Sequence, residues 1–206
     1  MYRYFLTRTA TAVALALVLP VTSVSMTVLA PATAQAASAA EALIDNFHSG
    51  LLSTMKQASS LGYSGRFKRI EPLVKRTFAL QTMMQVIVGP EWNGLSAADR
   101  GALMDAFGDW VVANYASRFN GWDGESFVTT GTTDGGRNTV VVQTEIRPQN
   151  VKLGYRVLNG KVVDVYLSGS VSQLAQWRSE FAAVLKQQGA KGLVAKLRSS
   201  ENQLAK

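Results

Sequence analysis

The side chains that could do acid–base or metal chemistry are few in this sequence and lie far apart. His48 is the only histidine, there is no cysteine, and Asp164 is a single acid inside an apolar segment. A general acid or base needs a positioned partner, and a metal site needs several ligands at fixed spacing. Neither His48 nor Asp164 belongs to a recognisable pattern of that kind. We therefore expect no metal, no cofactor and no catalytic set.

The motifs of nucleotide-binding and hydrolytic enzymes are also absent from the sequence. There is no G-x-S-x-G elbow, no G-x-x-x-x-G-K-[ST] phosphate loop and no G-x-G-x-x-G opening a helix. The glycines from Gly131 to Gly136 are better explained as a hairpin loop, with its turn at Asp134-Gly135-Gly136. The sequence predicts a binding protein rather than an enzyme. An exported hydrolase that uses Asp164 or His48 is kept as an alternative.

The N-terminus has the three parts of a secretory signal peptide. Met1–Arg8 carries two arginines and no acid, Ala10–Leu19 is apolar, and Ala34-Gln35-Ala36 matches an A-x-A cleavage site. A membrane anchor is the alternative, but Pro20 and the Ser and Thr residues after it interrupt the run before the roughly 20 apolar residues of a span. We expect residues 1–36 to be a cleaved signal peptide. Residues 37–206 then have the length of a single domain.

Basic residues outnumber acidic ones along the whole chain. There are 21 Lys and Arg against 14 Asp and Glu, a formal net charge of +7. Cleavage would remove Arg3 and Arg8, leaving 19 against 14 and a charge of +5. For an exported chain, this modest and dispersed surplus fits an anionic lipid surface or an acidic partner better than nucleic acid. An ordinary solvated basic surface explains it equally well, and we expect no nucleic-acid partner.

Four short segments in the middle of the chain are predicted to be strands. They are Glu125–Thr130, Asn138–Arg147, Val151–Leu158 and Lys161–Ser168. The third alternates apolar and polar residues with the period of two that is typical of a half-buried strand. Asn159-Gly160 supplies the two positive-φ positions of a type I′ turn between the last two. These strands form the sheet around which the rest of the chain is organised.

Helices are predicted before and after the strands in the sequence, because apolar residues recur in those segments at helical spacing. They cover Ser38–Ser60, Arg66–Phe78, Ala79–Val88, a segment from the capping box Ser96–Asp99 to about Asn120, Val171–Gln188, and Ala190–Arg198. An order of helices, then strands, then helices indicates an α+β protein with an antiparallel sheet.

The order and spacing of these segments resemble the MlaC family, the exported phospholipid-binding components of toluene-tolerance-type ABC transport systems. The resemblance covers about Phe47 to Leu197. It rests on Arg66–Val74 (R-x-x-x-I-E-P-L-V), Phe78–Leu80, Val88–Trp92, Leu95-Ser96, Phe107–Tyr115, Tyr155–Val157, Asp164-Val165, Val171-Ser172, Trp177–Phe181 and Gly189–Leu193. Departures at Gly169–Ser172, Trp177 and Lys161-Val162 look like the hopanoid-associated branch, often called HpnM.

The resemblance implies helices packed on a curved antiparallel four-stranded sheet that enclose an apolar pocket. It also implies a periplasmic carrier, expected to be a monomer. Such a carrier passes phospholipid or hopanoid between an outer-membrane lipoprotein–porin complex and an inner-membrane ABC transporter complex. The alternative is a non-enzymatic structural or adaptor protein that docks a membrane complex without lipid cargo, which would have a fully packed interior.

The apolar positions of the matching segments are the candidates for the lining of that pocket. They are Leu73, Phe78, Met83, Met84, Ile87, Trp92, Leu103, Phe107, Trp110, Val140, Val142, Tyr155, Val157, Val165 and Leu167. Each of them could also be an ordinary core residue. Arg147, Lys152 and Arg156 are candidates for meeting a lipid phosphate at the mouth, the alternative being that they form the solvated face of the sheet.

Overall fold

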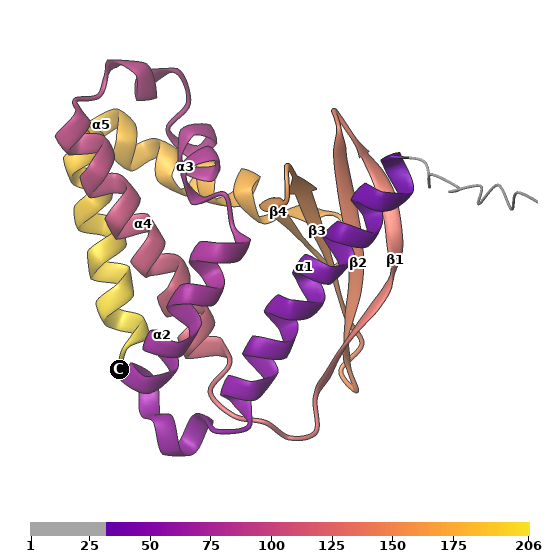
Figure 1. Cartoon of the computed structure of the whole chain (residues 1–206). Coiled ribbons are helices and arrows are strands. Elements are labelled where there is room, and N and C mark those ends of the chain that lie inside the picture. Colours follow the sequence, from indigo (N-terminus) through magenta and orange to yellow (C-terminus); the bar gives the residue numbers. More distant parts are fainter. Residues whose placement is uncertain (1–31) are drawn as a thin grey trace, which may run out of the picture. The chain divides into compact units, whose positions relative to one another are not determined.

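The structure, a computed structural model, describes residues 32–206 as helices followed by strands and a last long helix. The first part holds α1 (Ala32–Met55), α2 (Ala58–Thr77), α3 (Leu80–Val88), the 3-10 helix η1 (Gly89–Gly94) and α4 (Ala97–Arg118). The strands are β1 (Ser126–Gly136), β2 (Thr139–Arg147), β3 (Val151–Leu158), β4 (Lys161–Leu167) and β5 (Val171–Ser172), and α5 covers Gln173–Leu204. Figure 1 shows the strands on one side, α2, α4 and α5 on the other, and α1 lying along the sheet. The predicted α+β class is confirmed.

The sheet is one antiparallel meander in the order β1-β2-β3-β4-β5. Neighbouring strands pair directly because tight turns join them. Asn159 and Gly160 have φ angles of 48° and 71°, as a type I′ turn requires, which confirms the predicted hairpin. Arg137 and Asn138, at 50° and 59°, make the equivalent turn between β1 and β2.

The first strand is longer than the sequence predicted. Gly131 to Gly136 was expected to be a hairpin loop, but it continues β1, and the turn comes after it at Arg137-Asn138. The strand absorbs extra residues through register shifts between Thr129 and Gly131 and again before Gly136. Gly131 permits the first shift because its φ is +147°. At the opposite edge, the two-residue strand β5 pairs with β4, so the sheet has five strands instead of the predicted four.

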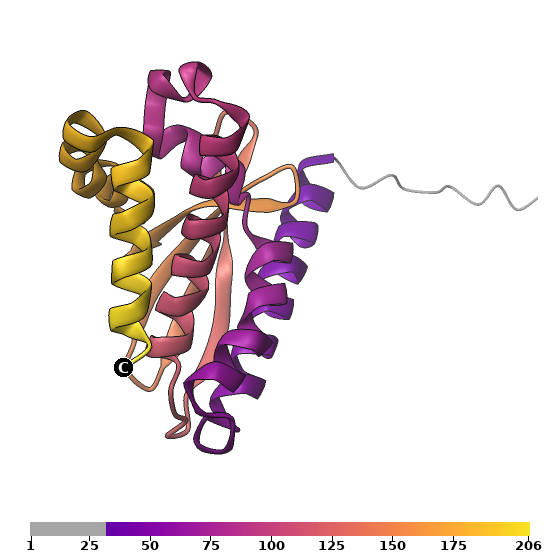
Figure 2. The ribbon, with the colours of Figure 1, turned by 90° about the vertical axis from the view of Figure 1, so that its left-hand side faces the viewer.

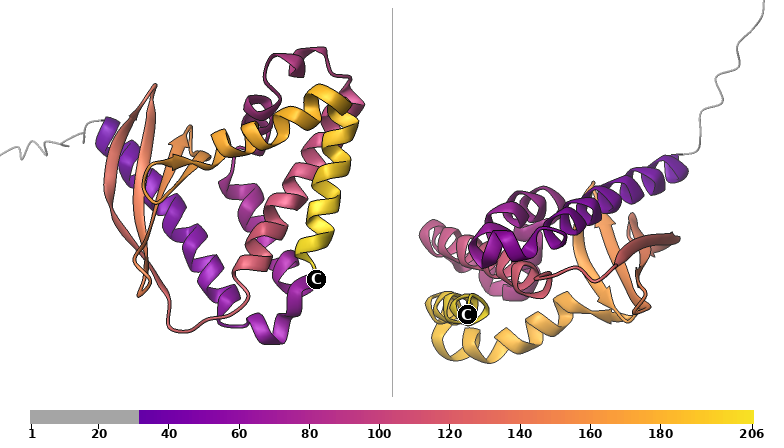
Figure 3. Two further views of the ribbon diagram at one scale, coloured as in Figure 1. Left: turned by 180° about the vertical axis from the view of Figure 1, so that it is seen from behind. Right: turned by 90° about the horizontal axis from the view of Figure 1, so that it is seen from below.

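The two faces of the sheet differ in character. Val142 on β2 lies opposite Tyr155 on β3, which lies opposite Val165 on β4, and this apolar face points at the helices. We call it the inner face. The residues between them, such as Arg156 opposite Val141, form the outer face. α1 packs on β1 and β2 and runs diagonally across the sheet, as both views of Figure 3 show.

α4 packs mainly on α2 and α5, away from the strands. In Figure 2 the C-terminal half of α5 runs alongside α4. The Ser96 hydroxyl accepts from the Asp99 backbone N–H at 3.0 Å, which confirms Ser96 as the predicted cap of α4. The Asp99 carboxylate accepts from this hydroxyl at 2.7 Å and not from the Ser96 backbone N–H that a full capping box uses. α5 joins the two helices predicted at Val171–Gln188 and Ala190–Arg198, with non-helical geometry at Gly189.

Most of the predicted signal peptide lies outside the described residues. α1 already begins at Ala32, so the cleavage predicted after Ala36 falls within that helix and stays a prediction. Within residues 32–206, no helix combines the length and the apolar character needed to cross a membrane.

Candidate functional site

A cavity of about 260 Å³ lies between α4, the inner face of β2 to β4 and the first turns of α5. It exists because the backbone of α4 packs on other helices and stands off from the sheet. Its lining consists of Phe78, Val111, Asn114, Tyr115, Arg118, Phe119, Ile146, Val151, Leu153, Tyr155, Val165, Leu167, Gln173 and Trp177. Most of these side chains are aliphatic or aromatic, so the cavity suits a hydrocarbon better than a polar metabolite.

Aromatic rings form one wall of the cavity. Phe78 and Tyr115 lie 5.9 Å apart between ring centroids, and Phe47 behind them is 5.3 Å from each, edge to face. Phe78 is placed by a bridge to Val162 of β4 in the short link between α2 and α3. This link fixes the helices to the sheet at the edge of the cavity.

Two polar side chains at the buried wall, His48 and Tyr155, are paired with each other. His48 Nε2 lies 2.9 Å from the Tyr155 hydroxyl, and the imidazole stacks on Phe127 with centroids 4.3 Å apart. Burial lowers the pKa of His48 to about 4, although the nearby Asp45 carboxylate acts in the opposite direction. Burial also raises the pKa of Tyr155 well above its usual value. Both groups are therefore neutral near pH 7, and this wall carries no charge.

Asp164, the other residue considered for catalysis, has a structural position. Its carboxylate accepts hydrogen bonds from the backbone N–H groups of Val165 at 2.8 Å and Leu174 at 3.0 Å. The Ser172 hydroxyl donates to it as well, at 2.6 Å. Asp164 thus ties the end of the sheet to the start of α5, which carries Trp177 to the cavity.

The cavity opens where the α4–β1 connection meets the β2–β3 turn. A second hollow of about 270 Å³ adjoins it there and shares Arg118, Phe119, Ile146 and Val151 with it. Arg118 is exposed in the last turn of α4 and belongs to none of the ion pairs found in residues 32–206. Val151 is 43% exposed at the same place. The mouth therefore combines exposed apolar surface with an available cation.

A family comparison decides what kind of protein has this cavity. The family model described as MlaC protein matches residues 45–199, most of the described chain. The chain belongs to the MlaC family. The resemblance found in the sequence between Phe47 and Leu197 is thereby confirmed. No curated protein sequence gives a significant match.

Solved structures show the same fold as this MlaC protein. One is the phospholipid-binding protein from Ralstonia solanacearum in complex with a phospholipid. It is 22% identical, its TM-score is 0.69, and the match covers 81% of this chain and 99% of that one. At this identity the likeness establishes the common fold.

Four of the pocket residues predicted for this MlaC protein line the cavity: Phe78, Tyr155, Val165 and Leu167. The structure places the other eleven elsewhere. They are Leu73, Met83, Met84, Ile87, Trp92, Leu103, Phe107, Trp110, Val140, Val142 and Val157. Leu73, for example, fills the space above Gly50 where α1 and α2 cross, since a Cβ on Gly50 would lie 2.5 Å from it. Val140, Val142 and Val157 share the inner face but do not reach the cavity.

The lining also includes residues that sequence reasoning missed. Leu153 alternates in phase with Tyr155, so the strand period could have identified it. Val111 and Trp177 lie on apolar helix faces, where the periodicity indicates burial but not a cavity. Arg118 gives no signal in the sequence, because its position at the mouth depends on where α4 ends relative to the sheet.

The three predicted headgroup cations lie on the outer face, away from the cavity. Arg156 donates to Thr139 Oγ1 at 3.0 Å and to the Gly135 carbonyl at 3.1 Å. Arg147 pairs with Glu145 at 3.2 Å, and Lys152 is directly opposite Glu145 on β3. The alternation that points Leu153 and Tyr155 inward necessarily points Lys152 and Arg156 outward. Arg118 is the cation that lines the cavity.

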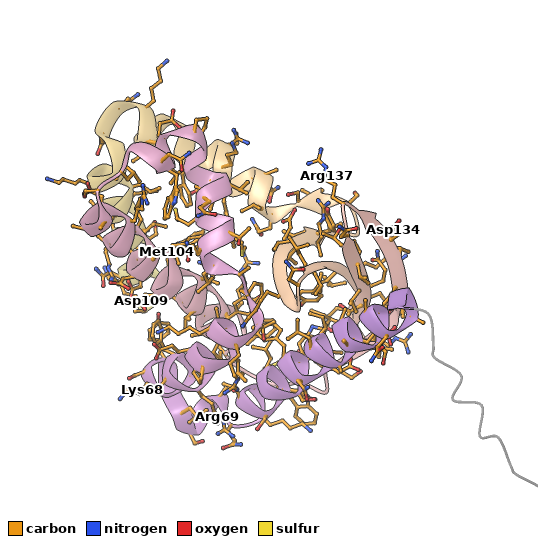
Figure 4. All side chains as sticks on the ribbon, turned by 45° about the horizontal axis from the view of Figure 1, so that its top comes forward. Lys68, Arg69, Met104, Asp109, Asp134 and Arg137 are labelled. Atoms are coloured by element: carbon orange, nitrogen blue, oxygen red, sulfur yellow. The ribbon has the colours of Figure 1, made fainter. Side chains whose placement is uncertain are left out.

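Other hollows on the described surface are more polar. One of about 600 Å³ lies between the start of α1 and the β1–β2 hairpin, with threonines and the Asp134 and Arg137 seen in Figure 4 around it. Another of about 380 Å³ is bordered by Met104, Asp109 and Arg198. In the second, Asp109 and Arg198 are 2.5 Å apart and neutralise each other. Neither offers the apolar walls of the cavity beside α4.

Proposed function

We propose that this MlaC protein is a lipid carrier that holds an acyl chain of a phospholipid in the cavity beside α4. The observation that carries the proposal is an apolar cavity with a neutral buried wall and an unpaired arginine at its open end. This polarity matches a phospholipid, whose hydrocarbon tail would point inward and whose phosphate would remain near Arg118. The common fold with a phospholipid-bound protein from Ralstonia solanacearum supports the same proposal.

The energetics of an acyl chain in water explain why a carrier needs such a cavity. Each methylene exposed to water costs about 0.8 kcal/mol, so a chain of roughly sixteen carbons costs on the order of 12 kcal/mol. The cavity volume of about 260 Å³ lies just under the roughly 300–1,000 Å³ of typical small-molecule sites. We therefore propose that the walls move apart on loading, with α4 moving relative to the strands.

The proposed setting is the periplasm, reached by means of the N-terminal signal peptide. There the protein would exchange lipid, as a monomer, with an outer-membrane lipoprotein–porin complex and an inner-membrane ABC transporter complex. We propose a binding role without chemistry, because His48 and Asp164 are both occupied in structural hydrogen bonds.

The decisive experiment is mass spectrometry of an organic extract of protein purified from the periplasm. We expect phospholipid at a near-stoichiometric amount. Recovery of hopanoid would keep the carrier role but change the cargo, as the HpnM-like departures in the sequence suggest. Recovery of neither lipid would contradict the proposal and favour an adaptor protein.

A further inference from the structure

An exposed tryptophan that the proposed function does not use lies next to the hollow at the mouth of the cavity. Trp122 lies in the connection between α4 and β1 and is 44% exposed. Its neighbours Gly121 and Asp123 line the hollow that adjoins the cavity, together with Arg118 and Val151. Val151, which lines this hollow, is 43% exposed as well, so exposed apolar surface is concentrated beside the entrance through which cargo would pass.

Two contacts hold the Trp122 ring at the surface. Its indole N–H donates to the Glu125 carbonyl at 2.9 Å, and the Lys56 ammonium lies over the ring, 5.0 Å from its centroid. Because the N–H is already paired within the protein, the ring can enter an apolar layer without taking along an unsatisfied donor. Tryptophan and lysine together are typical of the zone between lipid headgroups and acyl chains.

Basic side chains surround this position. Lys56 lies in the link between α1 and α2. Arg69 lies close to this link, because its guanidinium donates hydrogen bonds to the side chains of Ser53 and Gln57. Figure 4 shows Arg69 and Lys68 at that end of the molecule. Arg118 adds a third cation from α4, and it belongs to none of the ion pairs found in residues 32–206. The acids that line the adjoining hollow are Asp123 and Glu125, and the Glu125 carboxylate accepts from the Asp123 N–H at 2.6 Å within its own connection.

We propose that this end of the molecule docks on an anionic phospholipid bilayer, with Trp122 at the lipid interface and Lys56, Arg69 and Arg118 facing lipid phosphates. The inference rests on the proposed lipid-carrier function and adds how the carrier meets its lipid source. Each Lys or Arg near an anionic surface contributes about 1 kcal/mol, so the docking is weak and reversible and allows the carrier to leave.

Co-flotation with vesicles tests the docking directly. We expect the full mature protein to float with vesicles that contain phosphatidylglycerol and to bind more weakly to pure phosphatidylcholine. Trp122→Ala should reduce binding several-fold on both. Lys56→Gln should reduce binding to the anionic vesicles about fivefold, in line with the loss of one cation, and leave binding to neutral vesicles unchanged.

Matched controls are Val86→Ala, an apolar side chain 40% exposed on α3, and Lys186→Gln, an exposed lysine on α5. Lipid content is measured on the same preparations. Trp122→Ala protein that keeps its lipid but loses vesicle binding supports the proposal. Retention of vesicle binding in both Trp122→Ala and Lys56→Gln would overturn it. So would absence of binding by the unaltered protein, as expected if Trp122 docks a protein instead. If the purified protein contains no lipid but still binds vesicles through Trp122, the carrier function is refuted and the docking proposal stands.

Discussion

At the scale of single residues, His48 and Tyr155 show how a polar pair can sit in an apolar wall. The two side chains are buried and joined by one hydrogen bond between His48 Nε2 and the Tyr155 hydroxyl, so the hydroxyl of the cavity-lining tyrosine is paired. His48 also stacks on Phe127 of β1, which links α1 to the inner face. A histidine that looked isolated in the sequence therefore has its partner 107 residues away.

The pKa of His48 predicts how stability depends on pH. The folded protein holds this pKa at about 4, below its ordinary value of 6.5. Between these values the unfolded chain binds a proton that the folded chain does not, so stability falls as pH decreases from about 6.5 to about 4. The loss amounts to about 3 kcal/mol. Urea unfolding of the protein and of His48→Gln across this range should show a shallower pH dependence in the variant. Identical slopes would contradict the prediction.

Arg118 is the residue whose charge should affect cargo. Arg118→Gln removes the cation at the mouth, and because the site is exposed we expect only about a fivefold loss of affinity for a fluorescent phospholipid analogue. Arg147→Gln, on the outer face, is the matched control and should bind as the unaltered protein does. Equal losses in the two variants would indicate a general effect of charge instead of a contact at the mouth.

At the scale of elements, the junction of β4, β5 and α5 determines where the cavity ends. The Asp164 carboxylate accepts hydrogen bonds from two backbone N–H groups and from the Ser172 hydroxyl. Ser172 in turn caps α5 by accepting from the Ala175 N–H at 3.0 Å. These contacts aim the first turns of α5 across the sheet and bring Gln173 and Trp177 to the cavity. The carboxylate is therefore needed for architecture.

The bend in α5 depends on Gly189, and its backbone predicts a stability difference. Gly189 has φ 61° and ψ −160°, a region open essentially to glycine alone, and an added Cβ would meet no atom within 4 Å. Gly189→Ala should therefore destabilise the protein by about 1–3 kcal/mol through backbone strain alone. Gly101→Ala, within α4, should instead stabilise it by about 0.5–1 kcal/mol. Urea unfolding compares the two, and a neutral Gly189→Ala would refute the assigned strain.

At the scale of the whole molecule, the cavity exists because some helices pack on the sheet and others pack on one another. α1 covers the inner face over β1 and β2, while α4 is buried among α2, α3 and α5. The part of the inner face around Leu153 and Leu167 is left with only side chains to cover it, and these do not fill the space.

Filling that space should abolish cargo binding without unfolding the protein. Leu153 is half-buried and faces the cavity, so Leu153→Trp places a larger ring in the volume proposed for lipid. We expect the lipid recovered by extraction to fall several-fold while stability changes by less than about 1.5 kcal/mol, because the ring occupies empty space. Val86→Trp on the surface of α3 should keep its lipid. Undiminished lipid in Leu153→Trp would mean that cargo binds elsewhere.

The sequence by itself determined most of the helices and strands and the alternation along the strands. Val151–Leu158 could be predicted to the residue, and so could its turn at Asn159-Gly160, because period-two alternation and positive-φ turn residues are local signals. The hairpin loop predicted at Gly131–Gly136 was wrong. Its glycines have a low strand propensity, but pairing with β2 extends β1 through them.

Only the tertiary structure decided which buried residues border empty space. Met83 and Tyr155 are 1% and 2% exposed and belong to the same hydrophobic core, yet only Tyr155 lines the cavity. Hydrophobic periodicity reports that a side chain leaves water, but not whether its neighbours fill the space beyond it. That depends on the distance between α4 and the sheet, which contacts distant in sequence set, and the same distance brings Arg118 to the mouth in place of Arg147, Lys152 and Arg156.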